Sequence, residues 1–393
     1  MTPQARVQAA IEILDAVIAA AQGGGASADR IDADWFRTRR FAGSKDRRAV
    51  RDLVYGAIRA CGPVPQSGRA AMLRLAQGEP DLLTLFDGSR HGPEPIVAGE
   101  AIAESGTAPA WLEAALAQSG IHAEQAASLL GRAPLDIRVN TLRADRCAIA
   151  LPEQGEPLVA PQGLRLPSGT AVEQWDAYQH GLIEVQDGGS QIACLAVGAR
   201  PGETVIDLCA GAGGKTLALA AAMENRGRLI ACDTDRSRLS RLTPRAERAG
   251  ATIIETRLLN PNAERDALED FVGQADAVLV DAPCSGTGTW RRNPEARWRL
   301  SEREVARYAA IQSRLLDLAA QLVRPGGRII FVTCSLLDAE GADQAKAFLE
   351  RHPEWRAELP PLPAGSPRGA GWRLSPWADG TDGFFIASFG SPW

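Results

Sequence analysis

The stretch Asp207–Thr216 (DLCAGAGGKT) constrains the fold of this 393-residue chain more than any other. Residues 204–209 (TVIDLC) have the character of a buried strand, a glycine-rich turn follows, and residues 216–223 (TLALAAAM) favour a helix. A strand, a glycine turn and a helix bring backbone N–H groups close to a ligand at the helix N-terminus. A second strand, Arg228–Cys232, leads to Asp233, whose carboxylate can bind ribose hydroxyls. The stretch therefore predicts a nucleoside-cofactor site.

The glycine turn alone leaves more than one cofactor open. A P-loop requires a glycine five residues before Gly214, where this chain has Cys209, so a P-loop is excluded. A dinucleotide fingerprint requires its last glycine at Thr216, so a nicotinamide cofactor remains only as an alternative. S-adenosylmethionine (SAM) has no pyrophosphate and suits a glycine turn followed by an acidic residue on the next strand. A purely structural turn would explain the glycines but not the cysteine motifs described below.

Composition narrows the class of protein. Hydrophobic residues make up 45% of the chain, no apolar run approaches the ~18 residues of a membrane span, and no signal pattern opens the sequence, so we expect a cytoplasmic protein without a membrane partner. Seven cysteines without a C-x-x-C pair and four scattered histidines favour neither a disulfide framework nor a metal site. We expect a monomer that binds no metal. The net charge of −5 means that any contact with nucleic acid must use local patches.

Two stretches are rich in arginine. Residues 37–51 (RTRRFAGSKDRRAVR) carry seven basic side chains and one acid, and residues 291–299 (RRNPEARWR) form a second cluster. Such a run can be a solvated helix face, or it can contact phosphates, and nearby aromatic residues favour the second interpretation. Trp290 or Trp298 could stack on a base. The candidate RNA-binding residues are Arg37, Arg39, Arg40, Arg47, Arg48, Arg291 and Arg292.

The periodicity of the sequence predicts three regions. Helical patterns dominate residues 1–132, and residues 133–185 combine strand-like alternation with proline- and glycine-rich stretches, as in a small α/β linking module. In residues 186–393 strands and helices alternate. Such alternation predicts an α/β domain with a doubly wound, mostly parallel sheet, whose ligand crevice lies beyond the carboxyl ends of the strands.

Two cysteines follow predicted strands of this sheet. Residues 276–281 (DAVLVD) lead into a loop that carries Cys284, and residues 328–333 (RIIFVT) lead directly into Cys334. Adjacent parallel strands lie ~4.8 Å apart. If these two strands pair, we expect Cys284 and Cys334 to share one crevice, which the strand ending at Asp207 also borders.

A pair of cysteines beside a cofactor turn suits one chemistry in particular. Carbon 5 of a pyrimidine is a poor nucleophile, but a thiolate that adds at carbon 6 turns the ring into an enamine, which can attack an electrophilic methyl group. A carboxyl group can hydrogen-bond ring nitrogen 3 and stabilise the adduct, and Asp281 lies at the crevice edge. An amino-methyltransferase would instead place an aromatic residue after Asp-Pro-Pro or Asn-Pro-Pro, where this chain has Asp-Ala-Pro-Cys.

The segments DLCAGAGGKT, DAPCSGTGTWRRNPEARW and TCSLLDAEGADQ resemble the motifs of bacterial 16S ribosomal RNA cytosine-5 methyltransferases of the RsmB (Fmu/Sun) type. The resemblance implies an all-α NusB-like RNA-binding domain, the linking module, and a Rossmann-like SAM-dependent methyltransferase domain that acts on small-subunit ribosomal RNA. It also implies that Cys334 is the nucleophile and that Cys284 assists product release, whereas in DNA cytosine-5 enzymes the Pro-Cys residue attacks. Asp281 and Lys215 complete the catalytic candidates.

The resemblance also implies a set of cofactor-binding residues. The residue that meets the adenine amino group is usually acidic and corresponds here to Asn260, whose oxygen can still accept that hydrogen bond. Glu340-Gly341 stands where the family often has Glu-Asn, and we expect no functional loss from this. Two other functions remain open: a NusB-like RNA-binding or assembly factor with a residual catalytic site, and a nicotinamide-dependent oxidoreductase, which leaves the cysteine loops unexplained. The predicted SAM-binding residues are Cys209, Ala210, Gly211, Ala212, Gly213, Gly214, Lys215, Asp233, Asn260 and Asp281.

Overall fold

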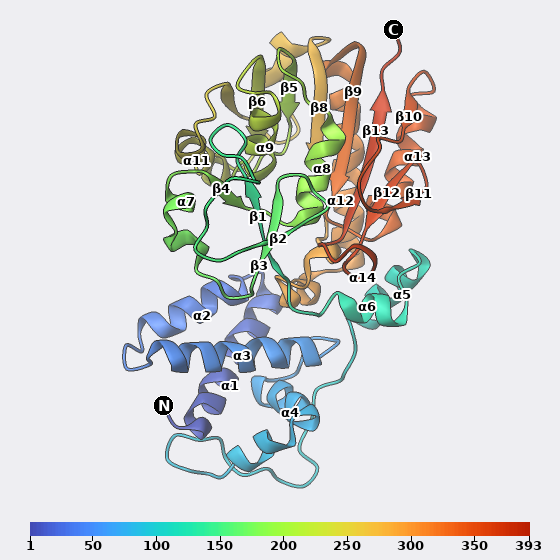
Figure 1. Cartoon of the computed structure of the whole chain (residues 1–393). Helices are drawn as coiled ribbons and strands as arrows, with labels where there is room; N and C mark the ends of the chain where they lie inside the picture. The colour runs from blue at the N-terminus through green and yellow to red at the C-terminus, as the bar shows by residue number, and fades with distance from the viewer. The chain divides into compact units, whose positions relative to one another are not determined.

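A computed structural model describes all of residues 1–393 and divides into two compact units (Figure 1). We call Met1–Gly131 together with Thr289–Glu302 the helical unit, and Arg132–Gly288 together with Arg303–Trp393 the sheet unit. This division differs from the predicted regions in two ways. The linking module belongs to the sheet unit, and Thr289–Glu302, which the sequence analysis assigned to the methyltransferase domain, belongs to the helical unit.

The helical unit is built around its first helix. Thr2 accepts a hydrogen bond from the Ala5 N–H to begin this helix, and Gly24, in the left-handed conformation, ends it. Apolar side chains at helical spacing along it are fully buried against the helices that follow. The helices are α1 (Pro3–Gly23), α2 (Ala28–Arg37), α3 (Ser44–Ala60), α4 (Gly68–Gly78), α5 (Ala110–Gln118) and α6 (Ala123–Ser128), with 3₁₀ helices η1 (Pro80–Leu85) and η5 (Pro294–Arg299).

The segment Thr289–Glu302 is part of the core of the helical unit. Trp298 is only 5% exposed, lies among the buried apolar residues of this unit, and donates a hydrogen bond from its Nε1 to the Gly62 carbonyl at 3.1 Å. The fully buried Arg297 donates to the carbonyls of Ile58 at 2.7 Å and Cys61 at 2.6 Å. Trp290 is also fully buried. The prediction that Trp290 or Trp298 stacks on a base is therefore wrong, because both indole rings are buried inside the protein.

The sheet unit contains two sheets. The linking module forms the smaller one, which is antiparallel with the order β2-β3-β1-β4. Its strands are β1 (Leu135–Val139), β2 (Glu156–Pro157), β3 (Gly163–Leu166) and β4 (Ile183–Val185), with the short helix α7 (Asp176–Gln179). Asn140, directly after β1, donates to the carbonyls of Gly181 and Ala249, both at 2.8 Å, and so connects the module to the rest of the unit.

The larger sheet has nine strands in the order β11-β12-β13-β9-β8-β5-β6-β7, with β10 paired to β13. The five strands from β9 to β7 are parallel to one another, as the sequence predicts. The strands are β5 (Thr204–Asp207), β6 (Arg228–Asp233), β7 (Ile254–Leu258), β8 (Ala275–Asp281), β9 (Val323–Thr333), β10 (Arg356–Glu358), β11 (Ser366–Arg368), β12 (Gly371–Leu374) and β13 (Phe384–Gly390). The helices are α8 (Gly188–Val197), α9 (Gly214–Ala222), α10 (Arg236–Leu239), α11 (Leu242–Ala249), α12 (Glu302–Leu322), α13 (Ala342–Arg351) and α14 (Pro376–Asp379).

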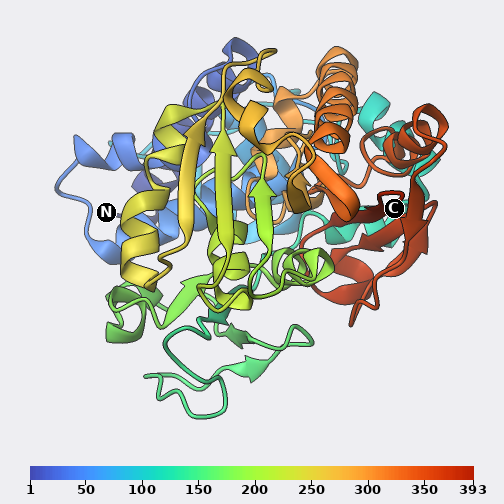
Figure 2. The same cartoon turned by 90° about the horizontal axis from the view of Figure 1, so that it is seen from above.

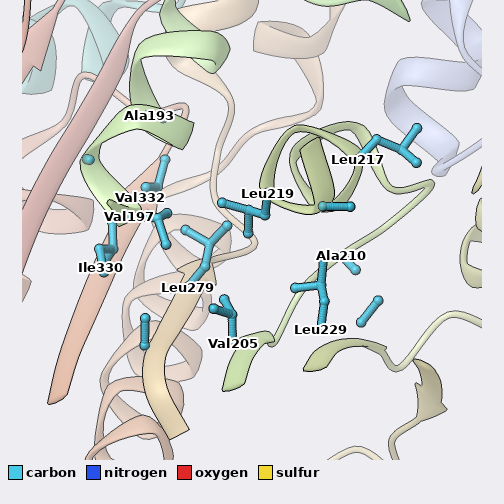
Figure 3. Close-up of a cluster of buried hydrophobic side chains, with 14 of the residues drawn as sticks. Ala193, Val197, Val205, Ala210, Leu217, Leu219, Leu229, Leu279, Ile330 and Val332 are labelled. Carbon is cyan, nitrogen blue, oxygen red and sulfur yellow. The ribbon is translucent and has the colours of Figure 1, made fainter. Parts of the chain in front are cut away.

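Both faces of this sheet are buried. Successive residues of the central strands alternate between two hydrophobic clusters, so that Leu279 belongs to one and Val280 to the other. Figure 3 shows the first cluster, in which strand residues such as Val205 and Leu279 meet Val197 of α8 and Leu219 of α9. The second cluster contains buried side chains of α12 and α13.

The C-terminal part of the sheet departs from the expected parallel arrangement. Strand β13 runs antiparallel to β9, and β12, β11 and β10 continue the antiparallel pairing, in the red part of Figure 2. Strand β9 also begins five residues earlier than the predicted start at residue 328. The helix ends at Leu322 and the strand begins at Val323, so that Pro325-Gly-Gly lies inside the strand instead of forming a connecting loop.

The predicted strand, glycine turn and helix are present as β5, residues 208–213 and α9. Gly211 and Gly213 have φ angles of 56° and 87°, in the left-handed region that favours glycine. A Cβ atom on Gly213 would lie 2.0 Å from Cδ1 of Leu242, which is fully buried. This turn therefore requires glycine at position 213 for both conformation and space.

Replacing Trp298 with alanine should destabilise the helical unit by ~3–5 kcal/mol, because its core would no longer contain a large buried side chain. Hydrogen exchange followed by mass spectrometry should show faster exchange in α1 and α3. Trp377→Ala is the matched control, since Trp377 is 54% exposed in the sheet unit and should leave exchange nearly unchanged. Unchanged protection of α1 and α3 from exchange in Trp298→Ala would show that Trp298 does not stabilise the core of the helical unit.

Replacing Gly213 with alanine should destabilise the ligand-free protein by ~1–3 kcal/mol, because the new methyl group overpacks the site against Leu242 in a strained backbone conformation. Gly214→Ala is the control: a Cβ there meets nothing within 4 Å, and alanine favours the helix that begins at this residue. Thermal unfolding of the two variants measures the difference. Equal melting temperatures would contradict the steric argument.

Candidate active site

The two cysteine loops meet at the carboxyl ends of β8 and β9. These strands pair in parallel with Asp281 opposite Val332, so the chain leaves both at the same edge of the sheet. The sulfur atoms of Cys284 and Cys334 lie 3.3 Å apart. The expected shared crevice is therefore present, and its two thiols are in direct contact.

A cavity of about 510 Å³ adjoins these thiols. Cys209 of the glycine turn, Asp233 at the end of β6 and Asp281 at the end of β8 line it together with Cys284 and Cys334. This volume falls within the ~300–1,000 Å³ of small-molecule sites. Of the predicted cofactor residues, only Cys209, Asp233 and Asp281 line the cavity. The side chain of Asn260 is exposed, and its neighbours Leu259, Pro261 and Asn262 line the cavity instead.

Asp233 organises the glycine turn. Its Oδ2 accepts a hydrogen bond from the Gly211 N–H at 2.8 Å, and its Oδ1 accepts one from the Asp235 N–H at 2.7 Å. The side chain is almost fully buried at the edge of the cavity. In addition, the Ala210 N–H donates to the Cys232 carbonyl at 2.7 Å. The turn and the end of β6 are thus held together by one carboxylate and one backbone hydrogen bond.

Lys215, the residue after the glycines, forms an ion pair with Asp281 at 2.7 Å between Nζ and Oδ2. Burial disfavours the charge on Lys215, but the Asp281 carboxylate outweighs this effect, and the pKa of Lys215 lies above its ordinary value. The ionised forms of Cys194 and Cys334 act in the same direction. Lys215 therefore carries a positive charge at neutral pH.

The thiols of this region differ in their surroundings. The Cys284 thiol has its pKa raised well above the ordinary value by its hydrogen bond with Cys334, by burial, and by the negative charge of Glu340. Burial likewise raises the pKa of Cys209, with neighbouring acids adding to the effect. Cys209 therefore remains a thiol and shapes the turn.

Two acidic residues matter here in ways that sequence reasoning missed. Glu340 is fully buried and binds the loops after both cysteines, although it was noted only as part of a motif. Asp207 is fully buried at the end of β5, and burial raises its pKa to about 7 despite a hydrogen bond from the Thr216 hydroxyl at 2.7 Å. Their burial, which depends on tertiary structure, gave no signal in the sequence.

The basic residues predicted to bind RNA fall into two groups. Arg37 pairs with Asp34 and Arg39 pairs with Glu12, with the Arg39 guanidinium 4.0 Å from the centre of the Trp35 ring. Arg47 donates to the Ala42 carbonyl. By contrast, Arg40 and Arg48 are exposed, and the structure gives neither an ion-pair partner. Only this second group is free to bind an external anion without breaking an internal contact.

The second arginine stretch does not form the exposed surface that was predicted. Arg291 is only 7% exposed and Arg292 is partly buried, and both make interactions within the protein. Arg299 donates to the carbonyls of Gly25 and Ala26 at 2.8 and 2.6 Å. These contacts anchor Thr289–Glu302 in the helical unit, so the structure gives no support to phosphate binding by Arg291, which stays a prediction.

Two further structural features bear on partners. None of the helices combines the length and the apolar character that crossing a bilayer requires. No group of three or more His, Cys, Asp or Glu side chains is arranged to hold a metal ion.

Comparison with solved structures supports the fold. A crystal structure of a protein designated PH0851 superposes with a TM-score of 0.74 at 25% identity and covers 98% of both chains. The methyltransferase homolog from Pyrococcus horikoshii gives a TM-score of 0.59 at 26% identity, covering 72% of this chain and 99% of that one. The α/β architecture with a methyltransferase-like parallel sheet is therefore shared with known structures.

Comparison with known sequences gives the family. The chain is 35% identical over 268 residues to the probable ribosomal RNA small subunit methyltransferase B of Synechocystis, covering 65% of this chain but 59% of the relative. It is 33% identical over 352 residues to the corresponding methyltransferase of Xanthomonas campestris, covering 86% of this chain and 75% of the relative. The family model described as 16S rRNA methyltransferase RsmB/F matches residues 194–390. The chain belongs to the RsmB/F family of 16S rRNA methyltransferases.

Proposed function

We propose that this protein transfers a methyl group from SAM to carbon 5 of a cytosine in 16S ribosomal RNA, by way of a covalent bond between Cys334 and the base. One observation carries the proposal: two cysteine thiols lie 3.3 Å apart beside a cavity that the glycine turn also borders. A nicotinamide-dependent oxidoreductase could also use a thiol pair, but the family is one of methyltransferases. The family description, which names 16S rRNA, supports the substrate.

The cavity fits the proposed cofactor. The glycine turn borders the cavity through Cys209, and we assign the methionine end of SAM to this side. Asp233 offers a carboxylate to ribose hydroxyls, and Leu259 and Pro261 provide an apolar wall for the adenine. When bound, SAM supplies an electrophilic methyl group. The adenine contact predicted for the Asn260 side chain is thereby reassigned to its neighbours.

The residues of the crevice can divide the reaction between them. Lys215 carries a positive charge that stabilises the Cys334 thiolate, the form that attacks carbon 6. Asp281, held by Lys215 at 2.7 Å, presents a carboxylate at the crevice edge. Addition at carbon 6 makes ring nitrogen 3 basic, and once protonated this nitrogen can donate a hydrogen bond to the Asp281 carboxylate. The addition makes carbon 5 nucleophilic toward the methyl group.

Release of the product requires a second thiol. A base such as a water molecule must take the carbon-5 proton, and the electrons of that C–H bond form the double bond between carbons 5 and 6. The bond between carbon 6 and the Cys334 sulfur breaks at the same time, with its electron pair returning to that sulfur. Cys284 has a raised pKa, so it carries its proton at neutral pH and can donate a hydrogen bond to the departing sulfur from 3.3 Å. This arrangement supports Cys334 as nucleophile and Cys284 as the residue that assists elimination.

The helical unit supplies the proposed RNA-binding surface. Arg40 and Arg48 are exposed and unpaired, and Phe41 between them in sequence is 73% exposed. Cations next to an exposed aromatic ring suit unpaired RNA, because they can bind phosphates while the ring stacks on a base. We assign phosphate contacts to these two arginines. Arg37, Arg39 and Arg47 can join them only by giving up internal interactions.

The two cysteine variants should behave asymmetrically with labelled SAM and unmodified small-subunit RNA. Cys334→Ala cannot form the adduct and should lose turnover by more than ~10³-fold without trapping RNA. Cys284→Ala should form the adduct, accept the methyl group and stall, giving a protein–RNA band that resists denaturation. Gel electrophoresis of both variants beside the unaltered protein measures this.

The opposite pattern, with RNA trapped by Cys334→Ala, would make Cys284 the nucleophile. RNA bound without any methyl transfer by the unaltered protein would instead favour the RNA-binding factor with a residual site. Cys147→Ala is a suitable control, because Cys147 is exposed and does not line the cavity.

Reversing the charge of both Arg40 and Arg48 should weaken RNA binding and reduce its salt dependence. Removal of one arginine–phosphate interaction should lower the slope of log K against log salt by roughly 0.7–0.9. The double variant Arg200→Glu/Arg356→Glu changes net charge equally at exposed positions of the sheet unit and serves as control. Equal salt slopes for both double variants would indicate that residues 37–51 form a solvated helix face and do not bind phosphates.

A further inference from the structure

A buried carboxylate joins the two cysteine loops. Glu340 ends the 3₁₀ helix η6 (Asp338–Glu340) and is fully buried. Its Oε1 accepts hydrogen bonds from the Ser285 N–H at 2.8 Å and from Nε2 of Gln312 at 3.3 Å. Its Oε2 accepts from the Ser335 hydroxyl at 2.7 Å and from the Ser285 hydroxyl. Every donor belongs to a cysteine loop or to the helix packed against it.

The two serines that donate to Glu340 are the residues that follow the two cysteines. Ser285 directly follows Cys284 and Ser335 directly follows Cys334, so one carboxylate fixes the chain at the residue after each thiol. The two serine hydroxyls also lie 3.2 Å apart. Thr287 strengthens the junction, since its hydroxyl accepts from the Leu336 N–H at 2.8 Å. The distance between the thiols thus depends on a network with Glu340 at its centre.

A fully buried carboxylate is costly unless it is compensated, and the structure pairs Glu340 with no Lys, Arg or His. Its compensation comes from hydrogen bonds only. A glutamine has nearly the same shape without a carboxylate, so replacing Glu340 with glutamine separates the effect of the carboxylate from that of the shape.

We propose that Glu340 is a positioning residue, which holds Cys284 and Cys334 in contact and places a buried carboxyl group beside the loop of Cys284. The inference about chemistry rests on the proposed function, whereas the inference about geometry does not. The negative charge of Glu340 acts on Cys284 in the direction that favours the thiol, after the larger effects of the Cys334 hydrogen bond and burial. The same carboxylate therefore serves both geometry and protonation.

The geometric part can be tested without RNA or SAM. Diamide oxidises two adjacent thiols to a disulfide, taking up two electrons and two protons to become the hydrazine, and the rate depends on how closely the sulfurs are held. The unaltered protein should form the Cys284–Cys334 disulfide readily. Glu340→Ala should form it more slowly, by about tenfold or more, because the loops lose their common anchor. Mass spectrometry of peptides after alkylation of the remaining thiols measures the rate.

The control for this experiment is Glu350→Gln, which removes an exposed acid from α13. Should Glu340→Ala fail to fold, the double variant Ser285→Ala/Ser335→Ala removes two hydroxyl donors and leaves the carboxylate with the Ser285 N–H and Gln312, and it should slow oxidation in the same direction. A folded Glu340→Ala that oxidises at the rate of the control overturns the positioning role, whether or not the protein methylates RNA.

The chemical part is tested by Glu340→Gln, which preserves shape and removes the charge. Elimination needs the Cys284 thiol, so activity falls as pH rises through its pKa. Without the charge of Glu340 that pKa is lower, and the alkaline limb of the kcat profile should move to lower pH, while SAM affinity stays unchanged because Glu340 does not line the cavity. An unmoved alkaline limb in an active variant overturns the protonation role. Loss of SAM binding would indicate a general structural defect and overturn it as well.

Discussion

The parallel pairing of β8 with β9 is the interaction on which the active site depends. Strands that run in the same direction end at the same edge, so cysteines fifty positions apart in the chain are delivered to one place. Because β5 pairs with β8 and β6 with β5, the glycine turn and Asp233 reach that edge too. Nothing in the loops themselves would bring a cofactor turn and a thiol pair together. The hydrophobic clusters on both faces hold the strands in register and thereby hold the site.

Acidic groups then set the fine geometry within this frame. Asp233 accepts a hydrogen bond from the glycine turn, and Asp281 forms an ion pair with Lys215. Glu340 accepts hydrogen bonds from both cysteine loops. Each carboxylate accepts from groups that the strands deliver to it, and each is partly or wholly removed from water. A buried carboxylate that lacks a hydrogen-bond donor costs free energy. These contacts therefore specify one arrangement of the site more strictly than apolar packing could.

Much of the site could be predicted from the sequence, because its motifs are local. The glycines of Asp207–Thr216 predict its turn, because the left-handed backbone conformation of the turn favours glycine. Cys284 and Cys334 each follow a recognisable strand. The strands β10 to β12 were not predicted, since their short, partly exposed segments show no clear periodicity. The buried strand β13 gives no local signal of its antiparallel direction. Glu340 and Trp298 could not be placed, because a buried carboxylate and an exposed one look alike in sequence, as do a core tryptophan and a base-stacking one.

The segment Thr289–Glu302 has a consequence for how the chain acquires its structure during synthesis. The helical unit comes first in the sequence, yet two of its core tryptophans and the buried Arg297 arrive more than 150 residues after Gly131. When a growing chain has only its first 131 residues outside the ribosome, the helices lack the side chains that close their interior. Domains ordinarily fold one after another in the order of translation. Here the first unit can complete its core only after β5 to β8 of the second unit have been made.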